Sequence, residues 1–154
     1  MTGVTLPVRS RYNSKYMKRK YLLDSNICIY LLRNKYGVMQ RIMREGWGNC
    51  CISEITVAEL LYGAENSDNP ERNVQLVNSF CSDMEVLPIS NIISLYANQK
   101  SLLKKQGTLI DDMDLFIGCT AIGYNLVMVT ENVKHLSRLK GINVENWVIR
   151  EKNG

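Results

Sequence analysis

Short apolar segments alternate with helix-like segments along most of this chain, and this alternation constrains the fold more than any other feature. The expected strands are residues 19–23, 49–52, 84–87 and 126–129, with an edge strand within 141–149. The segments between them carry apolar residues at helical spacing. Strands that alternate with helices are typical of parallel sheets, and short apolar strands fit burial on both faces. The sequence therefore predicts an α/β fold, a three-layer α/β/α sandwich with a mostly parallel central sheet of four to five strands.

The charge of the chain is unevenly distributed. The length of 154 residues suggests one domain with a core large enough to fold alone. Residues 1–20 hold six of the 19 Lys and Arg residues and no acid, whereas the whole chain has a formal charge of +4. We therefore expect a basic N-terminal leader at residues 1–19, disordered or extra to the fold, and a folded domain at residues 20–150. The leader could contact nucleic acid, although an unstructured extension is the plainer interpretation.

Hydropathy and cysteine usage bear on the location of the protein. No apolar run approaches the ~18 residues of a membrane span. Asp24 and Asn26 interrupt the one stretch that resembles a signal-peptide core. The chain has five cysteines, an odd number, and none forms a C-x-x-C pair, which favours reduced, buried thiols over disulfides. His135 is the single histidine of the sequence, so a Cys/His zinc site is disfavoured. We expect a cytoplasmic protein that has no membrane partner.

Three carboxylates stand alone in apolar surroundings. Asp24 follows the first expected strand, Glu59 is the only charge in residues 55–62, and Asp114 is the only charge in residues 113–125. Burying an unpaired carboxylate costs several kcal/mol or raises its pKa, so these acids need a compensating positive charge. Sites made of acids, amides and waters suit Mg²⁺ or Mn²⁺. We therefore expect one pocket in which the three acids hold a divalent metal.

Each acid also has a purely structural interpretation, and the spacing leaves both interpretations open. Asp24 could cap the helix that follows it, Glu59 could face solvent, and Asp114 could be a first-turn acid that the helix dipole favours. A phosphoacceptor aspartate after a strand, as in receiver domains, is a further possibility for Asp24. The sequence contains neither G-x-x-x-x-G-K-[ST] nor G-x-G-x-x-G, the usual phosphate-binding loops.

Six segments, in order, resemble the PIN-domain ribonucleases, and among these the VapC toxins of bacterial toxin–antitoxin pairs. They are Y-L-L-D-S-N-I-C-I-Y (21–30), C-I-S-E-I-T-V-A-E-L-L-Y-G-A-E (51–65), P-E-R-N (70–73), D-L-F-I-G-C-T-A (114–121), L-V-M-V-T-E-N (126–132) and V-E-N-W (144–147). The ordered set, rather than the D-x-N triplet alone, carries the resemblance. It implies a PIN-like nuclease domain over residues 20–150.

The resemblance implies roles for the residues that match the motif positions of the family. Asp24, Glu59 and Asp114 match its three acids, and they are expected to be catalytic and to bind Mg²⁺ or Mn²⁺. Many PIN domains have a fourth acid where this chain has an asparagine, so the number of metals is open and Asp111, Asp112 or Glu131 is a candidate replacement. The residues expected to support the acids are Asn26, Ser53, Thr56, Thr130 and Asn132.

The resemblance further implies the toxin component of a type II toxin–antitoxin system, a metal-dependent endoribonuclease that hydrolyses RNA phosphodiester bonds. The candidate substrate is initiator tRNA, cut in the anticodon stem-loop. Expected partners are a VapB-type antitoxin that covers the acidic site and a second copy of the chain in a homodimer. The alternative is a PIN-like RNA-binding or protein-interaction module with little or no catalysis. Candidate contacts to RNA phosphates are Arg33, Lys35, Lys134 and Arg138.

Overall fold

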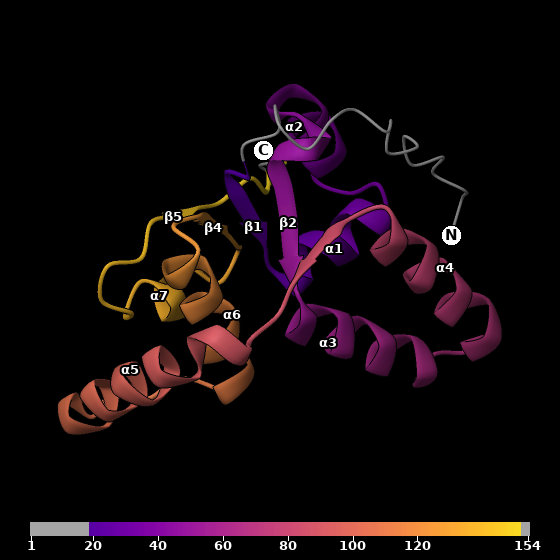
Figure 1. The fold of residues 1–154 in the computed structure, drawn as a ribbon. Helices are drawn as coiled ribbons and strands as arrows, with labels where there is room; N and C mark the ends of the chain where they lie inside the picture. Colours follow the sequence, from indigo (N-terminus) through magenta and orange to yellow (C-terminus); the bar gives the residue numbers. More distant parts are fainter. Residues whose placement is uncertain (1–18, 152–154) are drawn as a thin grey trace.

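A parallel sheet forms the centre of the computed structural model, which describes residues 19–151 (Figure 1). All four strand pairings are parallel, and the spatial order of the strands is β3-β2-β1-β4-β5. The expected α/β fold with a parallel sheet of four to five strands is therefore confirmed, with five strands. The strands are β1 (Tyr21–Leu23), β2 (Cys50–Ser53), β3 (Glu85–Leu87), β4 (Val127–Val129) and β5 (Val144–Glu145).

Helices connect the strands and form the outer layers. Among the described residues they are α1 (Ser25–Leu32), α2 (Val38–Glu45), α3 (Glu54–Glu65), α4 (Pro70–Ser82), α5 (Ile93–Gln106), α6 (Asp112–Gly123) and α7 (Val133–Leu136), with 3₁₀ turns at Trp47–Asn49 and Ser90–Ile92. None of these helices is both long and apolar enough to cross a bilayer.

Alternating side chains of the strands divide the interior into two cores. Leu23 and Ile52 pack on one face of the sheet, whereas Leu22 and Cys51 pack on the other, because successive strand residues point to opposite faces. Helices α1 to α4 supply much of the first core, and α5 to α7 supply much of the second, together with residues of the other strands and connecting segments. The molecule thus has the expected three layers, and Figure 1 shows the two groups of helices on either side of the sheet.

Four helices begin at polar residues that accept hydrogen bonds from backbone amides, and one of these is α4, where Asn69 accepts from the amide of Arg72. Asp24 precedes α1 and accepts from the amide of Ser25. Ser53 precedes α3 and accepts from the amide of Ile55, and Asp111 caps α6 in the same way. Such side chains satisfy amides that the first helical turn leaves free. Asp24 directly follows β1 and Ser53 is the last residue of β2, so these two caps lie at the carboxyl edge of the sheet.

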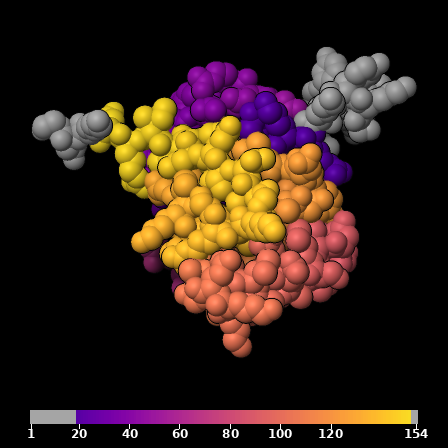
Figure 2. Space-filling view, turned by 90° about the vertical axis from the view of Figure 1, so that its left-hand side faces the viewer, coloured from indigo at the N-terminus to yellow at the C-terminus, as the bar shows by residue number. Residues whose placement is uncertain are grey.

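The predicted basic leader at residues 1–19 lies outside the described residues, apart from Arg19. This arginine forms an ion pair with Glu85 of β3, and its guanidinium lies 5.9 Å from the centroid of the Tyr124 ring. At the other end of the chain, residues after α7 lie across one face of the molecule, where Figure 2 shows them in yellow above the salmon α5.

Candidate active site

Asp24 leaves the end of β1 at the centre of the sheet. The strand order changes direction between β1 and β4, and open α/β sheets bind their ligands beyond the strand ends at such a switch point. The backbone amide of Asp24 donates to the carbonyl of Val129 at 2.9 Å, which ties this turn to β4. One carboxylate oxygen of Asp24 accepts from the Thr130 hydroxyl at 2.6 Å and the other from the Ser25 amide at 2.8 Å. The carboxylate is only 4% exposed and is held from two sides.

Glu59 reaches the same region from α3. Its Oε1 accepts a hydrogen bond of 2.7 Å from the hydroxyl of Ser25, the residue whose amide binds Asp24. A single serine therefore connects the first two acids. Ser25 is absent from the residues that the sequence predicted for the site, although its place between two of them in D-S-N is a signal that could have found it.

Asp114 enters from the first turn of α6. Its Oδ2 accepts a hydrogen bond of 3.3 Å from the side-chain amide of Asn132. The backbone amide of Asn132 donates to Thr130 Oγ1 at 2.9 Å, and that hydroxyl in turn donates to Asp24. Hydrogen bonds thus run without a break from Glu59 through Asp24 to Asp114, joining acids from three separate elements.

Burial and like charge both disfavour ionisation of these acids. Burial raises the pKa of Asp24, and the hydrogen bonds to its carboxylate oppose this shift. Burial is also the largest cause that raises the pKa of Glu59, followed by the charges of Asp24 and Asp111. For Asp114, burial together with the charges of Asp24, Asp111 and Glu59 raises the pKa to about 6. The pocket therefore concentrates negative charge where solvent screens it poorly.

No basic side chain within residues 19–151 forms an ion pair with these acids, since the ion pairs found there involve Glu45, Glu85, Asp112, Glu131 and Glu145. Asn26 follows Asp24 by two residues, and its Oδ1 is buried and accepts no hydrogen bond. Carboxylate and amide oxygens are the ligands that Mg²⁺ and Mn²⁺ prefer. The chemistry of the side chains gathered here fits a divalent cation.

The acids share a pocket, but they do not close around one point. In the part of the chain that the structure describes, no three His, Cys, Asp or Glu side chains are arranged to hold one ion. Ser25 separates Glu59 from Asp24, and Thr130 and Asn132 separate Asp24 from Asp114. The expectation that the three acids together hold a divalent metal therefore stays a prediction. Mg²⁺ usually keeps several waters and uses only one or two carboxylates, so this wider arrangement still suits it.

The remaining predicted residues have more varied positions. Ser53 Oγ accepts from the amide of Ile55 at 3.1 Å, so it caps α3 and contacts none of the acids. Thr56 is fully buried, and its hydroxyl has no hydrogen-bond partner. Arg138, a candidate RNA contact, instead donates from Nη1 to the carbonyls of Thr108 and Leu109 at 3.4 and 3.3 Å. Thr130 and Asn132 are thus the supporting residues that contact the acids directly.

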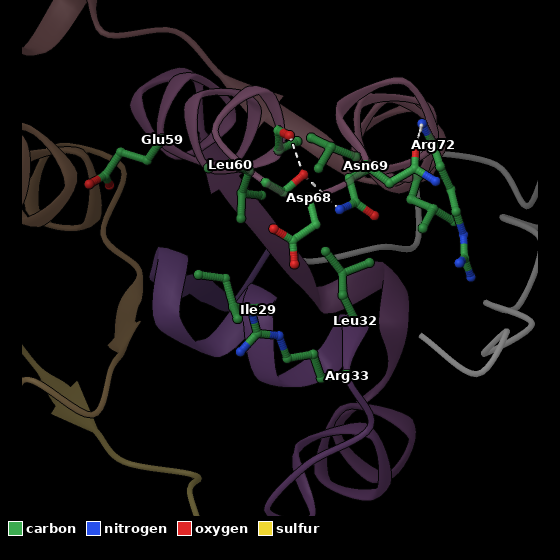
Figure 3. Close-up of a pocket in the computed structure, with 14 residues that line it drawn as sticks. Ile29, Leu32, Arg33, Glu59, Leu60, Asp68, Asn69 and Arg72 are labelled. Carbon is green, nitrogen blue, oxygen red and sulfur yellow. Dashed lines mark hydrogen bonds between the residues drawn. The ribbon is translucent and has the colours of Figure 1, made fainter.

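A groove of about 320 Å³ begins at Glu59 and continues between α1, α3 and α4 (Figure 3). Figure 3 shows Glu59 at one end, whereas Arg33 and Asp68 point into the groove from opposite sides. The groove therefore combines apolar and polar lining residues, and Glu59 is the one of the three acids that lines it. Its apolar lining includes Ile29, Leu32, Leu60, Leu76 and Val77.

Comparisons with known proteins agree with this architecture. The family model of the PIN domain matches residues 21–142. Ribonuclease VapC2 of Haemophilus influenzae is 37% identical over 130 residues, which is 84% of this chain and 98% of that protein. The tRNA(fMet)-specific endonuclease VapC of Salmonella typhimurium is 36% identical over 129 residues, or 83% and 98% of the two chains.

A solved structure is similar over the same region. The crystal structure of DNA-bound VapBC from Salmonella typhimurium superposes with a TM-score of 0.77 at 35% identity, covering 83% of this chain and 98% of that one. The match to the PIN domain replaces the receiver-domain interpretation of Asp24 and confirms the resemblance seen in the six motifs. The chain belongs to the PIN-domain family, and within it to the group of the VapC ribonucleases.

Proposed function

We propose that this chain is the toxin ribonuclease of a type II toxin–antitoxin pair, with Asp24, Glu59 and Asp114 as its catalytic centre. Relatives named as VapC ribonucleases support the activity. One observation carries the residue assignment: a continuous chain of hydrogen bonds joins the three carboxylates, which form no ion pair within the described residues. A site that only bound RNA would be expected to present basic side chains to the phosphates instead.

The ligand chemistry supports Mg²⁺ or Mn²⁺ as the cofactor. Asp24 and Asp114 would hold the ion, and Asn26 Oδ1 offers a further oxygen nearby. Such an ion acidifies and orients a water and stabilises the charge that develops on a phosphate. Thr130 holds the Asp24 carboxylate in a fixed orientation, which limits reorganisation during the reaction. Glu59, whose pKa is raised, is placed to accept a hydrogen bond from the attacking water.

We further propose RNA as the substrate and initiator tRNA, cut in its anticodon stem-loop, as the specific target. A relative named a tRNA(fMet)-specific endonuclease supports this choice. Solved relatives described as VapBC support a VapB-type antitoxin as partner. The groove that begins at Glu59 is the proposed seat of an antitoxin segment, because a segment lying there would reach the acids. The proposal includes a nuclease domain at residues 20–150, a homodimer and action in the cytoplasm, where tRNA is found.

The test is cleavage of purified RNA by the full chain in Mg²⁺, Mn²⁺ or EDTA. We expect cleavage to require the ion and to fall by at least ~10²-fold in Asp24→Asn, which keeps the size of the side chain. Asp112→Asn is the matched control, since Asp112 pairs with Lys100 at 2.8 Å, and it should keep the wild-type rate. RNA that binds equally well in EDTA and is never cut would favour the binding module.

The substrate is tested in cells. The chain is induced alone, and new RNA 5′ ends are mapped in parallel with those produced by the Asp24→Asn variant. Ends in the anticodon stem-loop of initiator tRNA that depend on Asp24 would support the proposed target. Asp24-dependent ends in other RNAs would support the ribonuclease activity but would show that initiator tRNA is not the target.

A further inference from the structure

We propose that Asp111 supplies the fourth carboxylate of the metal pocket, where Asn132 offers only an amide. The inference rests on the proposed metal-dependent ribonuclease and adds a residue to its site. It follows from two observations. Asp111 lies over the same helical turn as Asp114, and the other two candidate acids, Asp112 and Glu131, are paired with basic side chains elsewhere.

Asn132 contributes no negative charge to the pocket, and its side-chain amide acts as a donor to Asp114. The adjacent Glu131 is engaged elsewhere, because its carboxylate accepts from the Tyr30 hydroxyl at 2.7 Å and pairs with Arg150 at 2.7 Å. A carboxylate held by a guanidinium in this way already has its compensating charge. Glu131 therefore cannot replace the missing acid without giving up both partners.

Asp112 is likewise engaged away from the pocket. Its Oδ1 pairs with Lys100 Nζ at 2.8 Å and accepts from the Tyr96 hydroxyl at 2.8 Å. Both partners lie on α5, so they direct this carboxylate to the junction of α5 and α6. Of the three candidate replacements, Asp111 alone forms no ion pair among residues 19–151.

Asp111 and Asp114 occupy the N-cap and N3 positions of α6. Side chains at these two positions lie over the same first turn, which is why they can cooperate in capping. Asp111 Oδ2 accepts from the amide of Met113 at 3.1 Å, and its Oδ1 accepts no hydrogen bond within the described residues. One oxygen therefore caps the helix, and the other is available at the end of α6 that carries Asp114.

The electrostatic neighbourhood supports this placement. The charge of Asp111 is among the causes that raise the pKa of Glu59 on α3 and of Asp114 on α6. Coulombic influence weakens with distance, and the charge of Asp111 acts on acids of both helices. A divalent cation bound among these carboxylates would relieve their mutual repulsion.

The loop before Asp111 is held in place by contacts to its backbone. Arg138 Nη1 donates to the carbonyls of Thr108 and Leu109, and the amide of Thr108 donates to the carbonyl of Leu103 at 2.9 Å. A metal-site residue must be held by its surroundings to contribute affinity, because ordering it on binding costs free energy. The contacts from Arg138 hold the loop that leads to Asp111.

The experiment measures Mn²⁺ binding to the full chain by calorimetry, with melting temperature in EDTA as a second readout. Asparagine caps helices as well as aspartate does, so Asp111→Asn removes the charge and keeps the cap. We expect Mn²⁺ affinity to fall by at least ~10-fold, the lower bound for outer-shell partners of a metal, without a lower melting temperature in EDTA. Asp112→Asn is the adjacent control and should bind Mn²⁺ as the wild type does.

A compensating variant separates the pocket charge from the local effect of the substitution. The Asn132 side chain contacts Asp114, so an aspartate at position 132 places a carboxylate in the same pocket. Adding Asn132→Asp to Asp111→Asn should recover most of the lost affinity. Wild-type affinity in Asp111→Asn, or a loss that Asn132→Asp does not recover, would overturn the assignment of Asp111.

Asp24→Asn makes the two proposals distinguishable. If Asp24→Asn loses Mn²⁺ binding and Asp111→Asn retains it, the metal-dependent site stands and the role of Asp111 is wrong. If the wild-type chain binds no Mn²⁺, or if Asp24→Asn binds it unchanged, the proposed metal site and the role of Asp111 are both wrong.

Discussion

Thr130 donates its hydroxyl hydrogen bond to Asp24 across 2.6 Å, although 106 residues separate the two in the sequence. Thr130 is fully buried, and Asp24 is 4% exposed. The bond joins the ends of β1 and β4, the two strands between which the sheet changes direction. Because the same hydroxyl accepts from the amide of Asn132, one threonine connects the first acid with the residue that contacts the third.

Removing this hydroxyl should weaken both the fold and the site. Thr130→Val keeps the shape of the side chain but leaves Asp24 Oδ2 without its donor and the Asn132 amide without its acceptor. We expect the free energy of unfolding, measured in urea, to fall by ~1–3 kcal/mol, the usual cost of unsatisfied buried groups. RNA cleavage should fall as well. Thr130→Ser keeps the hydroxyl and should retain most of both properties; equal values for the two variants would contradict the role of this bond.

The raised pKa of Asp114 predicts a stability that depends on pH. Its folded value of about 6 lies above the ordinary value of 3.8, so the folded chain binds this proton more tightly than the unfolded chain. The resulting stabilisation is complete below the ordinary value and is lost as the pH rises through about 6. In EDTA, Asp114→Asn should therefore melt at a higher temperature than the wild type above that pH, and the difference should vanish near about pH 4.

Asp112 provides a control of opposite sign for this prediction. Hydrogen bonds from Lys100 and Tyr96 lower its pKa, so its ionised form stabilises the folded chain. Asp112→Asn should lower the melting temperature at neutral pH. If Asp114→Asn and Asp112→Asn shift the melting temperature in the same direction at neutral pH, the electrostatic account of the pocket is wrong.

Gly118 allows α6 to pack closely on the segment that follows β4. A Cβ at this position would overlap Leu139 Cδ1 and lie 3.0 Å from Leu136 Cδ1. We expect Gly118→Ala to lower the free energy of unfolding by ~1–3 kcal/mol, as overpacking does. Gly63→Ala is the matched control, because a Cβ there meets nothing within 4 Å and alanine favours a helix by ~0.5–1 kcal/mol. Denaturation curves in which both variants shift alike would contradict this packing.

Arg150 ties the C-terminal segment to the loop that carries Thr130. Its guanidinium donates to both oxygens of Glu131, at 2.7 and 2.9 Å, and lies 4.3 Å from the centroid of the Tyr36 ring. The Arg150 side chain is exposed, so Arg150→Ala should lower the free energy of unfolding only slightly. Arg150→Lys retains the charge and should recover part of this loss. Because salt screens exposed charges, the difference in unfolding free energy between wild type and Arg150→Ala should be smaller in urea titrations at ~1 M salt. A difference that salt does not change would assign the effect to packing alone.

Much of the fold was predictable because it depends on local patterns. Strand segments, the cap at Ser53 and the proline that begins α4 are all visible in short windows of sequence. Two local signals in the sequence predict helix boundaries that the structure does not have. Gly63 is a usual helix end, but α3 continues to Glu65, since Ala64 still packs in the core. Ser90 is a usual N-cap residue, but it lies in a 3₁₀ turn without a capping bond.

The sequence by itself singled out three acids as candidates, because a lone charge in an apolar window stands out without knowledge of the fold. Asp24, Glu59 and Asp114 were predicted in this way, and the structure brings them into one hydrogen-bonded pocket. Only the tertiary structure decided how they are connected and which neighbouring acid faces them. Ser25, Thr130 and the partners of Asp112 and Glu131 act across long stretches of chain, and such contacts depend on how the helices pack on the sheet.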